Sequence, residues 1–170
     1  MKGLIVRMIF EKKFLEEVSE LIIEMDKKGY KKHKKSKKWY NRYADNKGRV
    51  ILAKNENGKV IGYLSYSYIT KDCYDMLQNG LLTSDYALAN SCYCKESKQI
   101  LLTSIVVKKS QRNQGIAKAL YEEFKKDIGN ASYIAYFGDN LKESSFTVDL
   151  KRKGVQDSQN DLFYTIEQQI

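Results

Sequence analysis

The chain has 170 residues, of which 42% are hydrophobic and 30% charged, a balance typical of one soluble globular domain. No run of about 18 apolar residues occurs, so we expect no transmembrane helix, and the N-terminal apolar stretch is too short for a secretory signal. The net charge is +9, and three cysteines cannot all pair within one chain, so we expect a reducing cytoplasm as the location.

The N-terminal part predicts a strand followed by an amphipathic helix. Residues 4–8 are an apolar run, and residues 11–28 carry apolar side chains at three- and four-residue spacing, which are Phe14, Val18, Leu21, Ile22 and Met25. Gly29 is expected to end this helix.

The net charge is concentrated in residues 27–44, which we call the basic segment. It holds eight lysines, Arg42 and no acidic residue, so it accounts for +9, while the other 21 basic and 21 acidic residues cancel. Trp39 and three tyrosines lie in it, and we expect a loop and a short helix. Two interpretations stay open: a solvated surface, or a patch that attracts an acidic ligand such as a nucleic acid.

Two strands joined by a tight turn are predicted next. The runs 49–54 and 59–70 are apolar, and Asn57-Gly58 between them is a strong hairpin signal. Residues 71–99 show no clean period and form a long connection, in which we expect one or two helical turns. A further apolar strand is predicted at residues 101–107.

A basic, polar turn leads from that strand directly into another amphipathic helix. The apolar stripe of this helix is Ile116, Leu120, Phe124 and Ile128, and Gly129 is expected to end it. Strands at 132–137 and 161–167 follow, separated by an expected helix at 140–153 that ends at Gly154. The alternation of strands and helices indicates an α/β fold.

The turn between strand and helix has the features of a diphosphate-binding turn. A helix N-terminus presents unpaired backbone N–H groups and the positive end of its dipole, and both favour a bound phosphate. Gly115 has no side chain to keep an anion from the backbone, and Arg112 adds a permanent, fork-shaped donor. The alternative is that Gly115 is only structural punctuation.

The order Arg112-x-x-Gly115-x-Ala117 after a strand resembles motif A of the GNAT superfamily of N-acetyltransferases. The stretch VILAKNENGKVIGYLSY, residues 50–66, is similar to the second and third strands of the same family. The resemblance implies one domain over residues 1–170, with an insertion at 71–99. Its fold would be a mixed, mostly antiparallel central sheet flanked by helices, with strands that splay apart at the cofactor site.

The resemblance also implies acetyl-CoA (coenzyme A) as cofactor and direct transfer of the acetyl group to a primary amine in a ternary complex. The pyrophosphate is expected on the backbone of residues 114–118, and the pantetheine arm along the edge of strand 104–107. The implied cofactor-binding residues are Ile105, Val106, Val107, Arg112, Asn113, Gln114, Gly115, Ile116, Ala117, Lys118 and Asn140.

The catalytic groups are less well defined by the resemblance. Asn140 matches the family's asparagine by its offset from the preceding strand, and capping of the next helix is an equal alternative. The family's general-acid tyrosine has no counterpart, because the expected offsets reach Thr147 or Leu150. Thr147, Ser144 and Ser145 are therefore candidates by position alone, and a coenzyme-A-binding module without catalysis stays open. Tyr66 and Tyr68 are candidates to line an acceptor cleft.

The sequence leaves the partners open. We expect an amine acceptor of unknown identity that is acidic if the basic segment binds it, and a nucleic-acid-directed enzyme or binder is the alternative. The spacing of Cys73, Cys92 and Cys94 is not that of a zinc site, so we expect no metal. We expect no membrane partner, and the chain is expected to be a monomer or a homodimer.

Overall fold

A computed structural model describes residues 4–7, 14, 16–18, 20–21, 48–79, 81–82, 92–137, 154–156 and 162–166. The chain divides into two compact units, each made of two separate segments. Unit 1 comprises Met1–Ser65 and Ser104–Asp127, and unit 2 comprises Tyr66–Thr103 and Ile128–Ile170. No helix among the described residues is long and apolar enough to cross a membrane.

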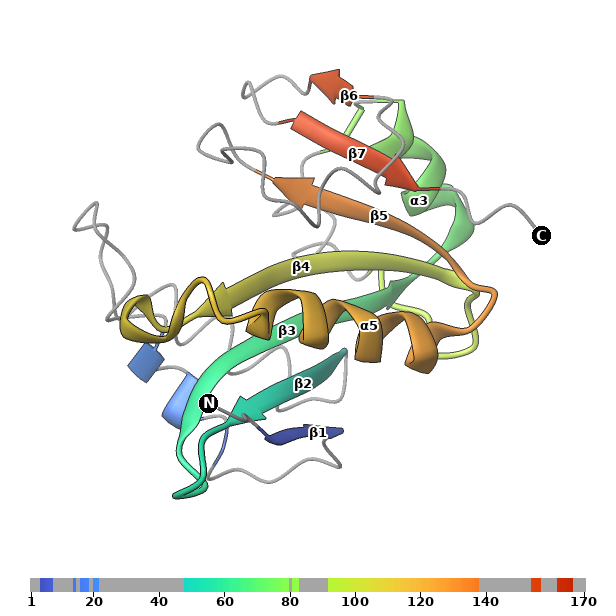
Figure 1. The fold of residues 1–170 in the computed structure, drawn as a ribbon. Helices are drawn as coiled ribbons and strands as arrows, with labels where there is room; N and C mark the ends of the chain where they lie inside the picture. Colours follow the sequence, from blue (N-terminus) through green and yellow to red (C-terminus); the bar gives the residue numbers. More distant parts are fainter. Residues whose placement is uncertain are drawn as a thin grey trace. The chain divides into compact units, whose positions relative to one another are not determined.

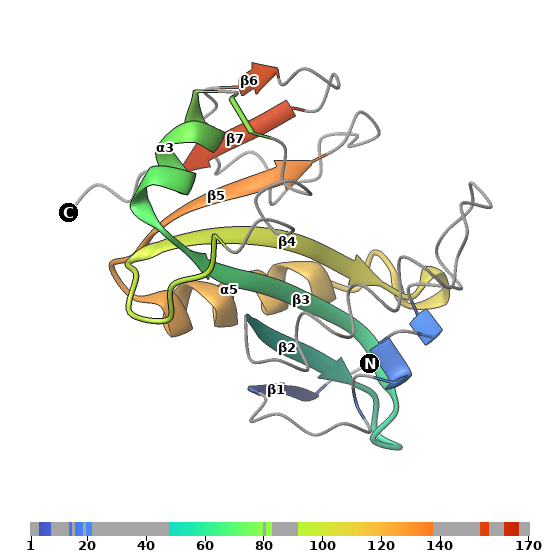
Figure 2. The ribbon, with the colours of Figure 1, turned by 180° about the vertical axis from the view of Figure 1, so that it is seen from behind.

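In unit 1 the hydrogen-bonded neighbours follow the order β1–β2–β3–β4. Strand β1 (Leu4–Arg7) pairs antiparallel with β2 (Arg49–Lys54), from Leu4↔Lys54 to Arg7↔Ile51. Strands β3 (Val60–Ile69) and β4 (Gln99–Val107) each begin in one unit and end in the other. Helix α5 (Ile116–Ile128) lies along one face of the unit 1 strands (Figures 1 and 2).

The turn between β2 and β3 is closed by its own hydrogen bonds. The side chain of Asn55 accepts from the backbone N–H groups of Asn57 (3.1 Å) and Lys59 (2.9 Å), and its main chain exchanges bonds with Gly58 and Lys59. Gly58 has φ 73, a left-handed conformation that glycine adopts without strain. The hairpin expected from Asn57-Gly58 is confirmed.

The core of unit 1 follows the predicted apolar stripes. The described residues between 14 and 21 are helical, and Val18 and Leu21 are buried, as the spacing predicts. Leu120 and Phe124 of α5 are fully buried, as are Leu52 and Leu64 of the strands. Burying one such side chain contributes roughly 1.5–3 kcal/mol.

One ion pair joins the end of α5 to the beginning of β2. Arg49 Nη1 lies 3.3 Å from Asp127 Oδ2. The Asp127 side chain is 2% exposed, whereas that of Arg49 is 53% exposed. Burial disfavours the charged form of the carboxylate and so raises the pKa of Asp127 above its ordinary value. The attraction of the exposed arginine, which acts the other way, is screened by water.

In unit 2 the hydrogen-bonded neighbours follow the order β3–β4–β5–β7–β6. Strand β5 (Ser132–Phe137) pairs parallel with β4 and antiparallel with β7 (Leu162–Ile166), and β6 (Gly154–Gln156) pairs antiparallel with β7. The predicted mixed, mostly antiparallel sheet is thereby confirmed. Helix α3 (Lys71–Gln78) contacts β5 and β7.

Helix α3 supplies the helical turns expected within residues 71–99. Thr70 caps it by accepting from the backbone N–H of Cys73 at 3.3 Å. Its buried side chains, Cys73, Tyr74 and Leu77, pack with Ile69 of β3 and Leu101 of β4.

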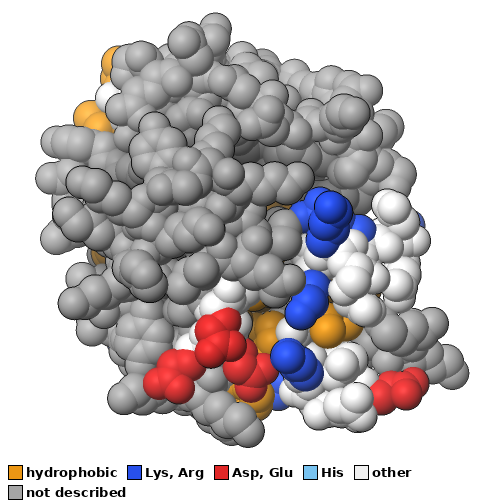
Figure 3. Space-filling model, turned by 90° about the vertical axis from the view of Figure 1, so that its left-hand side faces the viewer, with side chains coloured by type: hydrophobic (Ala, Val, Ile, Leu, Met, Phe, Trp, Pro, Cys, Tyr) orange, Lys and Arg blue, Asp and Glu red, His pale blue; other side chains and the backbone are white. Residues whose placement is uncertain are grey.

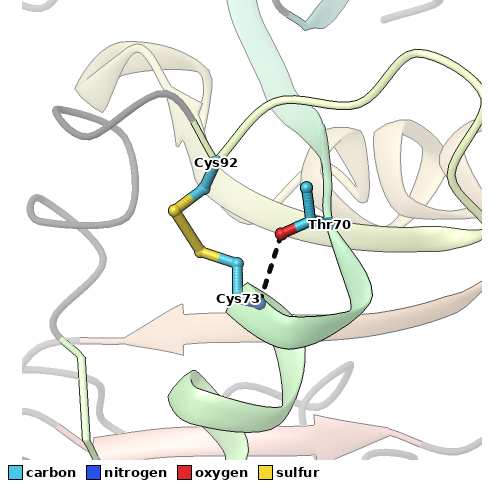
Figure 4. The surroundings of a disulfide bond; sticks show 3 residues. All are labelled: Thr70, Cys73 and Cys92. Carbon is cyan, nitrogen blue, oxygen red and sulfur yellow. Dashed lines mark hydrogen bonds between the residues drawn. A yellow bond between two sulfur atoms is a disulfide. The ribbon is translucent and has the colours of Figure 1, made fainter.

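A disulfide between Cys73 and Cys92 closes this region (Figure 4). The segment after Cys92 lies against the end of β3: Thr70 N donates to Cys92 O at 2.8 Å, and Tyr93 forms a bridge with Ile69. Cys94 is free and half-buried. The expectation of a reducing location rested on the odd number of cysteines. An odd number still allows two of the three to pair, as Cys73 and Cys92 do here.

Gly154 differs from its expected role. The sequence indicated only the end of a helix there, whereas the structure begins β6 at this residue. A strand of three residues is too short for a periodic signal, and its pairing partner β7 is defined only by the folded sheet. The expected helix 140–153 lies outside the described residues, as does the basic segment.

Candidate functional site

The candidate site begins where β4 ends, in unit 1. The backbone N–H of Lys108 donates to Ile61 O of β3 at 2.8 Å, which fixes the exit of the strand. A short 3-10 helix, Lys109–Gln111, follows, and Gln111 N donates to Lys108 O at 2.8 Å. The chain then reaches Arg112, whose Nε donates to Val107 O at 3.1 Å. This bond holds the guanidinium group beside the end of the strand.

The turn from Arg112 to α5 has a left-handed backbone at two positions, a feature that also occurs in anion-binding loops. Asn113 has φ 63 and Gly115 has φ 76, so two of its residues are left-handed. Gly115 O accepts the first helical bond, from Ala119 N at 3.0 Å. The N–H groups of residues 116–118 therefore precede the first intrahelical donor, have no acceptor within the helix, and are directed out of the helix end.

The space and charge above this turn suit a phosphate group. A Cβ atom built on Gly115 would meet nothing within 4 Å, so the space directly beside this residue is open. The first turn of α5 contains no acidic residue. Arg112, before the helix, and Lys118, within its first turn, are both exposed. The helix dipole and these cations act in the same direction on an anion.

Strand β4 supports the site with a closely packed neighbour. A Cβ atom on Gly62 of β3 would lie 2.8 Å from Val106 O, so only glycine permits this approach. Ser65 Oγ and Ser104 Oγ are 2.7 Å apart and share a hydrogen bond. The parallel pairing of β4 with β5 ends at Leu102↔Ala135, in unit 2, while β4 itself continues to Val107, in unit 1.

The structure brings most of the predicted cofactor residues together on one strand–turn–helix element of unit 1. Ile105 and Val106 are half-buried, Val107 and Ile116 are buried, Ala117 is half-buried, and the turn residues are exposed, which are Arg112, Asn113, Gln114 and Gly115. Asn140 and Thr147 lie outside the described residues. Tyr66 and Tyr68, in unit 2, are in edge contact with ring centroids 6.0 Å apart.

Two backbone features of the site were not predicted from the sequence: the close approach at Gly62, and the left-handed conformation of Asn113, which was named only as a cofactor residue. Gly62 sits inside an apolar strand run, where an isolated glycine is itself a signal of close backbone approach. Asn113 is left-handed, a conformation that asparagine tolerates better than other side chains. In the described part of the chain, Gln111 Oε1 is buried without a hydrogen-bond partner.

Comparison with known proteins assigns the family. The model of the Acetyltransferase (GNAT) family matches residues 15–141, so the chain belongs to the GNAT acetyltransferase family. This match spans β2, β3, β4, α5 and β5, including the turn at Arg112–Gly115. A search of curated proteins found no match.

Solved structures share the fold at low sequence identity. A protein of Pyrococcus horikoshii OT3 is 14% identical with a TM-score of 0.70, and the alignment covers 99% of this chain and 100% of that one. The PaiA N-acetyltransferase of Thermoplasma acidophilum, in complex with coenzyme A, is 14% identical with a TM-score of 0.64 and the same coverage. A GNAT family acetyltransferase of Brucella melitensis, in complex with acetyl-CoA, is 11% identical with a TM-score of 0.59, covering 99% of this chain and 92% of that one.

Proposed function

We propose that this protein is an acetyl-CoA-dependent N-acetyltransferase that transfers acetyl to a primary amine. The observation that supports this most directly is the turn at Arg112–Gly115, where two left-handed residues open the N-terminus of α5 beside an arginine held by Val107 O. Family membership supports the same reaction class. Two solved relatives of the same fold were crystallised with coenzyme A or acetyl-CoA.

The residues of the turn fit the diphosphate of this coenzyme. The backbone N–H groups of residues 116–118 would donate to the phosphate oxygens, and Arg112 would add a charge-assisted bond. The edge of β4 at residues 104–107 would pair with the amides of the pantetheine arm, as an added strand would. When bound, acetyl-CoA supplies the activated acetyl thioester. The chain orients it against the amine, and such positioning is a large part of catalysis.

An acidic acceptor is part of the proposal because the net charge of +9 resides in the basic segment. A long-range positive field concentrates acidic ligands and accelerates their association. A nucleic-acid-directed enzyme or binder is the second candidate, favoured by the same charge together with Trp39 and the tyrosines. If it is correct, binding of RNA or DNA falls steeply as salt is raised.

Calorimetry with acetyl-CoA tests the cofactor site. Replacing Arg112 by Gln removes a charge-assisted bond worth about 1.5–3 kcal/mol, so we expect coenzyme affinity to fall by ~10- to 100-fold. The control Lys98→Gln removes one exposed positive charge in unit 2 and should leave affinity unchanged. Absence of binding heat in the wild-type protein would refute the proposed function.

A thiol-release assay separates the enzyme from a non-catalytic module. Coenzyme binding without turnover across a panel of polyamines, aminoglycosides, peptide N-termini and aminoacyl-tRNA would favour the module, a reading motivated by the missing family tyrosine. Replacing the lysines between Lys31 and Lys38 by neutral residues tests whether the basic segment takes part in acceptor binding. Unchanged acceptor kinetics would remove the basic segment from the proposal.

A further inference from the structure

Unit 1 contains a second candidate site, a charged cavity of about 360 Å³. Its lining comes from three separate parts of the chain: the N-terminal helix, the β2–β3 turn and the residue after β4. The lining residues are Glu17, Glu20, Leu21, Asn57, Gly58, Lys59, Val60 and Lys108. None of them belongs to the turn at Arg112–Gly115.

The wall of this cavity is preformed. Glu17 Oε2 accepts from the backbone N–H of Val60 at 3.1 Å, which joins the N-terminal helix to the start of β3. The β2–β3 turn is closed by the four bonds around Asn55, and the main chain of Lys108 is bonded to Ile61. A wall with fixed backbone loses little conformational entropy when a ligand binds.

The lining carries two acidic and two basic side chains together with two apolar ones. Glu17 and Glu20 come from one helix, and Lys59 and Lys108 come from the neighbouring ends of β3 and β4. Leu21 and Val60, only 4% and 5% exposed, supply the apolar part. Figure 3 shows a face on which acidic side chains gather beside a row of lysine and arginine side chains, with apolar atoms between them.

We propose that this cavity binds a small zwitterion that carries an ammonium group and a carboxylate joined by a short aliphatic chain. The ammonium would contact the glutamates, the carboxylate would contact the lysines, and the methylene groups would cover Leu21 and Val60. A ligand with a single charge would pair with either the glutamates or the lysines, and its uncharged methyl end would face the other pair. The two acidic and two basic residues cancel, so a ligand without net charge fits best.

Titration calorimetry or NMR with aminoalkanoates tests the proposal. The probes are γ-aminobutyrate and ε-aminocaproate, which differ in the length of the chain between their charges, and butylamine and butyrate are the singly charged comparisons. We expect one aminoalkanoate to bind more tightly than both comparisons, and binding to weaken as salt is raised. Binding of an aminoalkanoate no tighter than that of butylamine or butyrate would overturn the proposal.

Matched variants place the binding in this cavity. Glu20→Gln and Lys59→Gln each remove one exposed charge of the lining, and each should weaken zwitterion binding by ~1.5- to 5-fold, with the double variant weaker than either. Glu56→Gln changes an exposed residue of the same turn outside the lining and should have no effect. Equal affinities in all variants would refute the location. Acetyl-CoA binding, measured on the same variants, should be unchanged, so this proposal and the proposed function can fail separately.

Discussion

The disulfide between Cys73 and Cys92 should stabilise the folded chain measurably. It links positions 19 residues apart in the sequence and joins α3 to the segment beside the end of β3. A crosslink lowers the entropy of the unfolded chain by an amount that grows with the closed loop. For a loop of about 20 residues the loss corresponds to ~3 kcal/mol at 25 °C. In a chain of this size that energy shifts the melting midpoint by roughly 6–12 °C.

The assay compares unfolding of the protein with and without a dithiol reductant. Mass spectrometry of unreduced peptides first establishes which cysteines are joined, and the reductant converts the disulfide to two thiols while it is itself oxidised. Cys94→Ser is the matched control, because Cys94 is free and its loss should leave the shift intact. A verified Cys73–Cys92 link whose reduction leaves the midpoint unchanged would refute the reasoning.

Three further predictions follow from single residues. Asp127→Asn should gain stability relative to wild type as pH rises. Burial raises the pKa of Asp127, so the stability that its protonated carboxyl contributes is fully present below pH 3.8 and is lost as pH rises through the raised pKa. Melting curves of both proteins at acid and at neutral pH measure this difference. Gly62→Ala should lower the free energy of unfolding by ~1–3 kcal/mol, because its methyl group meets Val106 O, a backbone atom; denaturant titration checks this. Gly115→Ala should cost about 1–2 kcal/mol through its φ of 76 and Gly115→Asn less, so equal melting midpoints would contradict the left-handed turn.

The strand–turn–helix element was predictable because each part has a local signal. Short stretches of sequence are enough to recognise the apolar run that ends at Val107, the polar turn, and the apolar stripe that ends at Ile128. The predicted bounds agree with those of β4 and α5 within two residues. The apolar hairpin around Asn57-Gly58 was predictable for the same reason.

Features that depend on distant segments were not predictable. The charged cavity joins Glu17, Lys59 and Lys108, and no window of sequence contains all three. The pairing of Cys73 with Cys92 depends on the bridge between Ile69 and Tyr93, which exists only once that segment lies against β3. The strand β6 is defined by its neighbour β7 rather than by its own three residues.

The two units are interleaved along the sequence, and this limits how the protein can be divided. Unit 1 resumes at Ser104 after unit 2 has begun, and unit 2 resumes at Ile128 after unit 1 has ended. No single cleavage of the polypeptide therefore yields either unit whole, and neither could be expressed as one contiguous fragment. During synthesis neither unit can be completed until its second segment has been made. Folding of each unit therefore depends on contacts between residues far apart in the chain, and such contacts slow folding.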